Sequence, residues 1–315
     1  MIPYILRRLF FLVLTLLLTS VLIFIITQRL PGDVCRVILG REVGAGAVEA
    51  CRDDLGLDRP AVTRYFIWLA DFIRGEWGRS YSTNVEIFPQ VMGRLRNSLM
   101  LGGLTMLVGV PLAVALGAVA ALNEGRLLDN VISLGGLSVV GLPEFVTGIV
   151  LIEVLAFRLG LPANSSIREA ASFFEALPSL ILPALTATFV LLAYIARLTR
   201  AGVLEELKQP YVRTAYLKGL PRRTIIWRHV LRNALLPTIT VVAISIGWLV
   251  SGLVVIENVF NYPGLGRLMV FAISHRDLPM LQAIGMVTVL GFALANLAAD
   301  LLSAALNPRI RFGSR

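Results

Sequence analysis

The sequence predicts an all-α integral membrane protein with six transmembrane helices, a large extracytoplasmic segment after helix 1, and a cytoplasmic helix between helices 4 and 5. Of its 315 residues, 57% are hydrophobic and 16% are charged, whereas soluble domains carry about 25% charged residues. The charges are also unevenly placed, so long stretches have none. This distribution indicates that lipid is the solvent for much of the chain.

The first apolar run, Leu9 to Gln28, is long enough at about 1.5 Å per residue to cross about 30 Å of hydrocarbon. Two arginines, Arg7 and Arg8, precede it, as in a signal peptide. The run exceeds the ~7–15 apolar residues of a signal peptide, and no small-residue cleavage site follows, so we expect an uncleaved first span. Five further spans are predicted at Asn97–Leu122, Val131–Phe157, Leu177–Ala196, Ala234–Ile256 and Met280–Ala299.

Positive charge predicts which side of the membrane holds the termini, which six spans place together. On their side lie fifteen Lys and Arg: two before span one, one after span two, nine after span four and three in the tail. The short loops on the other side hold four. Basic loops stay in the cytoplasm, and long translocated segments such as the one after span one largely escape this rule. Both termini are therefore predicted to be cytoplasmic.

The segment after span one, residues 30–96, is a polar extracytoplasmic excursion with nine arginines and nine acidic residues. Within it, residues 62–74 place Tyr65, Trp68 and Phe72 at helical spacing, and Gly75 ends the predicted helix. Its apolar face could receive a partner, or it could pack on the membrane interface or on the chain's own spans. The cysteines Cys35 and Cys51 also lie here. An oxidising compartment permits a disulfide between them, although two separate thiols stay possible.

The second excursion, residues 197–233, separates spans four and five. Residues 212–218 predict a short helix that Gly219 and Pro221 end, since Gly adopts the left-handed cap and Pro cannot continue a helix. A second helix begins near Arg222, and its predicted apolar face holds Ile226, Trp227, Val230, Leu231 and Ala234. A basic helix here could lie on anionic lipid. The helix–Gly–helix shape instead favours an elbow that enters a cleft on another protein.

The two parts of this excursion resemble the coupling loop of ABC-importer permeases, most of all the B-type subunit of the dipeptide/oligopeptide family. The stretch 211–220, YVRTAYLKGL, and the stretch 228–237, RHVLRNALLP, carry the resemblance. The sequence LGLDRP at 55–60 with GRS at 78–80, ENVFNYPGLGR at 257–267 and NPRIR at 307–311 resemble other parts of that family in the same order. The spacing from Gly219 to Pro237 is longer than in sugar importers.

This resemblance implies a bacterial inner-membrane permease that works with a second permease, two ATPase subunits or a fused dimeric ATPase, and an extracytoplasmic binding protein. It implies three regions: 1–29 with helix 1, 30–96 outside, and the core 97–315. It also implies peptide import, with nickel or glutathione as alternative cargoes. The residues expected to contact the ATPase are Arg213, Thr214, Ala215, Lys218, Gly219 and Leu220.

The chain itself supplies no energy-harvesting or cofactor chemistry. Walker loops place Gly-Lys before Ser or Thr, whereas leucine precedes both lysines, Lys208 and Lys218. ATP and Mg²⁺ are therefore expected on a partner. A structural zinc site needs about four ligands, and the chain has two histidines and two cysteines, so no metal site is predicted. The arginines flank apolar runs rather than coat one soluble face, which argues against nucleic acid.

Ionisable residues inside spans indicate a transport pathway. Glu144 and Glu153 lie in the predicted span three, and Glu144 follows Pro143, which disrupts the helix ladder. We predict that both carboxylates can line the pathway. Glu257 and Asp300 instead fall near span ends, where water or arginine can satisfy them. A gradient-driven secondary transporter is the alternative class; it would need no elbow and would be expected to show inverted repeats.

Overall fold

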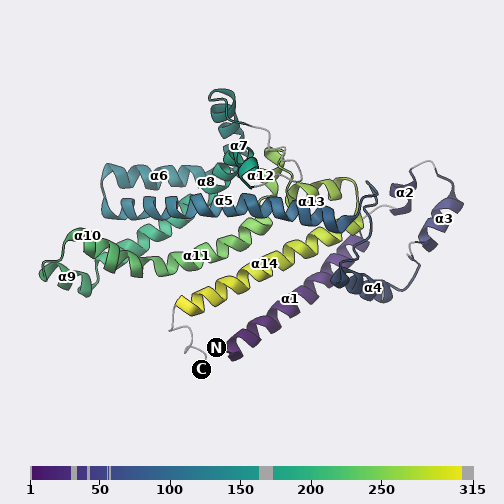
Figure 1. The fold of residues 1–315 in the computed structure, drawn as a ribbon, viewed down its shortest axis with the longest axis horizontal. Helices are drawn as coiled ribbons and strands as arrows, with labels where there is room; N and C mark the ends of the chain where they lie inside the picture. Colours follow the sequence, from purple (N-terminus) through teal and green to yellow (C-terminus); the bar gives the residue numbers. More distant parts are fainter. Residues whose placement is uncertain are drawn as a thin grey trace.

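The computed structural model describes residues 2–29, 34–40, 43–54, 56, 58–162 and 173–306. The tail motif at 307–311 lies outside the described residues. Within them the regular structure is helical, apart from one isolated antiparallel bridge between Arg79 and Glu86. Figure 1 shows the helices arranged as a long bundle with an arm and two helical ends.

The helices that could cross the membrane alternate with short ones. In chain order, they are α1 (Ile2–Gln28), α2 (Val34–Leu39), α3 (Ala45–Asp54), α4 (Ala61–Arg74), α5 (Ile87–Leu122), α6 (Leu127–Gly141), α7 (Glu144–Leu151), the π-helix η1 (Ile152–Phe157), α8 (Phe173–Leu207), α9 (Pro210–Leu217), α10 (Arg222–Thr224), the π-helix η2 (Ile225–Val230), α11 (Leu231–Gly252), α12 (Val254–Val259), α13 (Leu265–Ser274) and α14 (Leu278–Leu306).

Five helices are long and apolar enough to span a bilayer, and they contain the predicted spans one, two, four, five and six in whole or in large part. Most extend beyond the apolar runs, because a helix continues where polar residues meet headgroups or packed protein. The second, for instance, begins ten residues before Asn97. Among the described residues the five spans are Ile5–Gln28, Ile87–Leu122, Phe174–Leu207, Arg222–Leu249 and Leu278–Leu301.

Two of the predicted spans have the wrong shape. Span three was expected to run unbroken through 131–157, but α6 and the α7–η1 arm meet at a bend of 108°. Pro143 lacks an N–H and holds Leu142 in an extended conformation (φ −90°, ψ 135°), which ends the helix before it. The bend makes this pair a broken span or a re-entrant loop. Span five also ends early, because α11 stops at Gly252 and α12 follows as a separate helix.

The bundle has α5 and α8 at its centre. In Figure 1, α6 lies beside them, α11 follows, and α14 and α1 complete the bundle on the far side of α11. The helices α9 and α10 lie at one end of the molecule and α2 to α4 at the other. We call these the elbow end and the α4 end. The α7–η1 arm leaves the bundle at a steep angle between the two ends.

Backbones touch where glycine faces a neighbouring helix. A Cβ atom on Gly202 would lie 2.6 Å from the carbonyl oxygen of Ala234, so α8 and α11 meet backbone to backbone. Gly117 of α5 likewise faces the carbonyl oxygen of Ala196 of α8. Small residues at such contacts are how helices pack closely in lipid, where burial of apolar surface gives no net drive. The three helices nearest the elbow are thereby held in fixed contact.

The helix predicted at 62–74 forms as α4 and packs on the chain's own first span. The Tyr65 hydroxyl lies 2.8 Å from the Ser20 hydroxyl of α1, and the Phe24 ring lies 5.5 Å from that of Tyr65 and 5.7 Å from that of Trp68. Of the readings left open, the packing of this face against a span therefore agrees with the structure. Gly75 caps the helix in the left-handed conformation, with φ 83°.

The segment that follows α4 is fastened to α14 through a buried carboxylate. Asp277 accepts hydrogen bonds from the Ser80 hydroxyl, from the Tyr81 and Ser82 backbone N–H groups, and from the Ser82 hydroxyl. It also accepts one from the backbone N–H of Met280 at the start of α14. Farther out, Cys35 of α2 and Cys51 of α3 form a disulfide in the structure, with their Cα atoms 5.9 Å apart.

Candidate functional site

The elbow, defined here as residues 210–230, changes direction at a glycine, Gly219. The backbone N–H of Gly219 donates to the Tyr216 carbonyl (3.0 Å) and that of Leu220 donates to the Ala215 carbonyl (3.3 Å). This pair of bonds is the Schellman motif, whose turning residue must adopt a left-handed conformation. Gly219 has φ 73°, as the sequence predicted for a glycine cap. Pro221 then starts the second half of the elbow with its backbone extended.

A small core of its own joins the elbow to the spans. Val212 and Ala215 of α9 and Ile225 and Val230 of η2 are buried together. They pack with residues that α5, α8 and α11 contribute. Because packed interiors resist deformation, a force on α9 or η2 reaches these three helices. The members of this core are Ala118, Ala121, Val203, Val212, Ala215, Ile225, Val230, Leu231 and Ala234.

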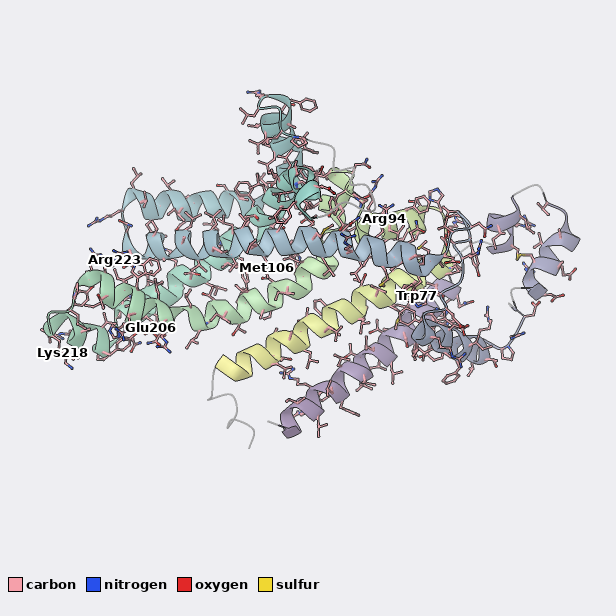
Figure 2. The ribbon with its side chains drawn as sticks, viewed as in Figure 1. Trp77, Arg94, Met106, Glu206, Lys218 and Arg223 are labelled. Carbon is pink, nitrogen blue, oxygen red and sulfur yellow. A yellow bond between two sulfur atoms is a disulfide. The ribbon has the colours of Figure 1, made fainter. Side chains whose placement is uncertain are left out.

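A network of hydrogen bonds around Tyr211 also joins the elbow to the spans. The Tyr211 hydroxyl donates to the Glu206 carboxylate at the end of α8 and accepts from the Asn233 side chain of α11 at 3.1 Å. Burial, and then the hydrogen bond to Glu206, raise the pKa of Tyr211 above its ordinary value. The phenol therefore stays protonated at neutral pH and keeps donating. Figure 2 shows Glu206 at the base of the elbow and Lys218 at its tip.

The tip of the elbow exposes large apolar side chains. Leu217 is 80% exposed and Trp227 is 69% exposed, and Tyr216 and Leu220 are exposed as well. Basic side chains surround them, all exposed in the isolated chain: Arg213, Lys218, Arg222, Arg223 and Arg228. Apolar residues of this size, ringed by polar ones on a surface, mark an interaction site. The elbow can therefore fill an apolar pocket on a partner and meet acidic groups around it.

Most residues predicted to contact the ATPase lie on this surface, and one does not. Arg213, Thr214, Lys218, Gly219 and Leu220 are exposed. Ala215 is instead buried, with 7% of its surface exposed, in the core beneath the elbow. The structure therefore does not bring Ala215 to the surface with the other five; it lies on the inner face of α9 and supports the elbow from within.

Trp227 was also expected on the wrong face. The sequence grouped it with Ile226, Val230 and Leu231, but the structure turns it to solvent. These residues belong to a π-helix, in which hydrogen bonds run from i to i+5. The wider turn rotates side chains away from the positions that a period of 3.6 predicts. Sequence periodicity could not find this exposed tryptophan, although π-helical turns often occur at functional sites.

The two carboxylates proposed for the transport pathway lie on the bent arm. Glu144 is partly buried in the first turn of α7, directly after the bend, and Glu153 is exposed on η1. The arm also exposes Ile149, Val150 and Phe157. The structure does not bring the two carboxylates together with the elbow. It places both at the side of the bundle, where a second subunit or lipid must cover the apolar surface.

Glu257 contradicts the expectation that water or arginine satisfies it. It is 1% exposed, accepts from the Ser98 hydroxyl of α5 at 2.5 Å, and accepts from the backbone N–H of Arg267 at 3.1 Å. A Cβ atom on Gly264 would collide with its carboxylate, and one on Gly266 would collide with Val254 and lie 3.0 Å from that carboxylate. The motif at 257–267 is thus a structural turn in which the Glu257 carboxylate caps the start of α13.

Asp300 fits its expectation better, because Arg8 of α1 pairs with it at 2.8 Å. A second ion pair was missed altogether. Asp129 in the first turn of α6 is 2% exposed and binds Arg200 of α8 through two bonds of 2.7 Å. Nothing in the sequence around Asp129 indicates that its partner lies 71 residues later, at Arg200. The sequence alone therefore could not predict this ion pair.

Groups of three or more His, Cys, Asp and Glu side chains that could hold a metal ion do not occur in the part of the chain that the structure describes. The elbow carries no titratable cluster suited to catalysis either. What the elbow presents is a set of exposed apolar side chains, exposed basic side chains and a fixed backbone turn.

Two family models match the chain. Residues 113–312 match the binding-protein-dependent transport system inner membrane component, and residues 1–101 match the N-terminal part of such membrane components. The glutathione transport system permease proteins GsiC of Escherichia coli strain K12 and of Shigella dysenteriae serotype 1 are both 35% identical to it over 313 residues. The alignments cover 99% of this chain and all of each relative.

These matches cover both the bundle and the segment before it, and the elbow falls inside the first of them. They agree with the absence of a Walker loop, since ATP hydrolysis in this family is done by separate subunits. The chain therefore belongs to the binding-protein-dependent transport system inner membrane components, the multi-pass permease subunits of ABC transporters.

Proposed function

We propose that this permease imports short peptides and that its elbow is the coupling element on which an ATPase acts. The single observation that carries the proposal is the elbow's construction. Its tip offers exposed Leu217, Leu220 and Trp227, while its base is packed against three spans. An ATPase that closes on ATP would push the tip, and the packed base would tilt α5, α8 and α11.

Orientation follows from the charge distribution. Fifteen Lys and Arg flank the spans on the elbow side, against four in the short loops opposite, which supports cytoplasmic termini and a cytoplasmic elbow. The segment 30–96 then lies outside, where a binding protein delivers cargo. The exposed apolar faces of α6 and the α7–η1 arm support contact with a second permease across the pathway, with Glu144 and Glu153 facing that route.

Peptide cargo is supported by the relatives, which are named for glutathione, a tripeptide. Glutathione itself is the first alternative for this chain, and nickel is another. A pore need not bind what it passes, so the lack of a metal cluster among the described residues does not decide between them. A gradient-driven transporter remains the competing class, and uptake by the isolated chain without nucleotide would favour it.

The first test removes an apolar contact at the elbow's tip. Leu217→Glu is expected to weaken ATPase binding at least tenfold, because truncating a central apolar anchor of an interface costs about 2 kcal/mol or more. Leu217 is 80% exposed in the isolated chain, so folding should be unaffected. The measurement is the amount of ATPase that copurifies with the full chain, together with ATP-dependent peptide uptake in proteoliposomes.

Val62→Glu is the matched control, since Val62 is also exposed (68%) but lies on α4 at the opposite end. It should leave ATPase copurification unchanged. Equal copurification with Leu217→Glu and with the unaltered chain would exclude the elbow tip as the ATPase contact. Uptake that needs no ATPase at all would exclude the proposed function itself.

The cysteine pair tests the orientation. With Cys35 and Cys51 joined outside the membrane, a membrane-impermeant maleimide added to spheroplasts should label the chain only after treatment with an impermeant reductant. The chain has no other cysteine, so the signal belongs to this pair. Equal labelling before reduction would contradict the bridge, and labelling that requires permeabilised cells would contradict the orientation.

A further inference from the structure

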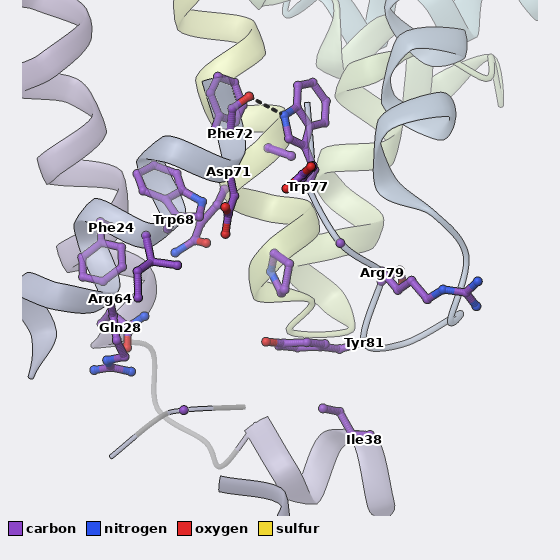
Figure 3. A pocket seen from close by; sticks show the side chains of 18 of the residues that line it. Phe24, Gln28, Ile38, Arg64, Trp68, Asp71, Phe72, Trp77, Arg79 and Tyr81 are labelled. Carbon is purple, nitrogen blue, oxygen red and sulfur yellow. Dashed lines mark hydrogen bonds between the residues drawn. The ribbon is translucent and has the colours of Figure 1, made fainter. Parts of the chain in front are cut away.

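A cavity of about 930 Å³ opens at the α4 end, away from the bundle interior and the elbow. The end of α1, α4, the loop at 76–84 and the start of α14 surround it, and Ile38 of α2 closes part of the open side. Its volume lies in the range of small-molecule sites, which are about 300–1,000 Å³. Figure 3 shows most of the side chains that line it.

One wall is a preformed row of aromatic rings. The ring of Trp68 lies 5.7 Å from that of Phe24 and 6.3 Å from that of Phe72, and Phe72 stacks on Trp77 at 4.9 Å. The Trp77 indole N–H donates to the Phe72 carbonyl at 2.9 Å, which fixes the ring. A wall already in place needs little ordering on binding. It offers a surface for an apolar side chain or a peptide plane.

Two opposite charges lie on the same face of α4 and line the cavity. Arg64 and Asp71 are seven residues apart, about 10 Å along a helix axis at 1.5 Å per residue, and Trp68 lies between them. In the part of the chain that the structure describes, neither side chain has an ion-pair partner, and the buried Arg64 Nε has no acceptor. Buried donors are usually satisfied, so Arg64 calls for an acceptor from outside.

The remaining polar groups complete an amphipathic lining. Tyr81 presents a phenol whose pKa is raised by burial and by the nearby Asp277, so it stays a neutral donor and acceptor. Arg59, Glu76 and Arg79 also line the cavity and are exposed to solvent. The arrangement thus has one partly buried cation and one partly buried anion, with aromatic surface between them.

We propose that this cavity binds a zwitterionic peptide of about three residues, with its carboxylate on Arg64 and its ammonium group on Asp71. An extended chain spans about 3.3–3.6 Å per residue, so three residues match the rise of about 10 Å between positions 64 and 71 on the helix. The inference rests on the proposed function in one respect: a permease for short peptides would catch its cargo here after the binding protein releases it. The site recognises both ends of the peptide and few details of its side chains.

The experiment uses the full chain in lipid nanodiscs, with no binding protein. Trialanine, N-acetyl-trialanine and trialanine amide are titrated by calorimetry and by tryptophan fluorescence, since Trp68 and Trp77 line the cavity. Trialanine should bind, and either cap should weaken binding at least tenfold. The Arg64→Gln chain should bind trialanine no more tightly than it binds trialanine amide. The Asp71→Asn chain should bind trialanine no more tightly than it binds N-acetyl-trialanine.

Arg74→Gln is the matched control, because Arg74 is exposed on the same helix and does not line the cavity. It should bind all three peptides as the unaltered chain does. Caps that change binding less than twofold overturn the inference, and they do so without any variant that could misfold. Binding that is normal in both Arg64→Gln and Asp71→Asn overturns it as well.

A parallel uptake assay on the assembled transporter separates this inference from the proposed function. If ATP-driven uptake occurs but the chain in nanodiscs binds capped and uncapped trialanine with equal affinity, only the cavity site is overturned. If the chain discriminates the caps as expected while uptake is independent of ATP, the site stands and the proposed function is overturned.

Discussion

Replacing Gly219 with valine should abolish ATP-driven uptake while the spans stay folded. Gly219 has φ 73°, and a Cβ atom there would meet nothing within 4 Å, so the obstacle is the backbone conformation rather than space. The left-handed conformation costs an ordinary L-residue about 1–2 kcal/mol, and a β-branched residue is a genuine outlier there. The Schellman turn would open, and the elbow would no longer hold Leu217 in its present position at the tip. Uptake in proteoliposomes and ATPase copurification measure the loss.

Gly219→Asn provides the control, because asparagine tolerates the left-handed conformation and can replace glycine at a helix cap. It should retain most of the uptake, although it adds a larger side chain at the same position. If valine and asparagine lower uptake equally, bulk at the contact is responsible and the turn is not. Normal uptake with valine would remove the elbow from the mechanism.

Apolar runs determined most of the bundle in advance. Lipid forces every backbone polar group to be satisfied within the segment, so long uncharged stretches such as Leu9–Gln28 had to be helices. The glycine turn at 219 could also be predicted from the sequence, because residue type and position both indicated a left-handed cap. In each of these places, local sequence decides the local structure without help from distant residues.

The failures have other causes: two come from local geometry that hydropathy and periodicity do not register, and two depend on distant contacts. The unbroken span three was wrong because hydropathy does not register the geometry that Pro143 imposes. Trp227 was assigned to the wrong face because a π-helix changes the angular spacing. Glu257 was expected to meet water, yet Ser98, 159 positions earlier, supplies its hydrogen bond. The opposed charges of Arg64 and Asp71 were present in the sequence, but the cavity that gives them meaning requires four separate segments.

Gly264→Ala should destabilise the chain by about 3 kcal/mol or more, among the larger effects of a single substitution. The added Cβ would overlap the Glu257 carboxylate, and that carboxylate cannot move away. It is 1% exposed and held by the Ser98 hydroxyl at 2.5 Å and the Arg267 N–H at 3.1 Å. Displacing it would strand a buried charge and several donors, which is costly. The melting temperature of the purified full chain should fall by about 5 °C or more.

A double-mutant cycle identifies the cause of that loss. In a Glu257→Ala background the collision is absent, so adding Gly264→Ala should cost much less than in the unaltered chain, as expected for residues in contact. Gly103→Ala is the neutral reference, because a Cβ there meets nothing within 4 Å and alanine suits a helix interior better than glycine. If Gly264→Ala were equally costly in both backgrounds, strain at the start of α13 would be responsible. The carboxylate would then no longer explain why glycine occupies this position.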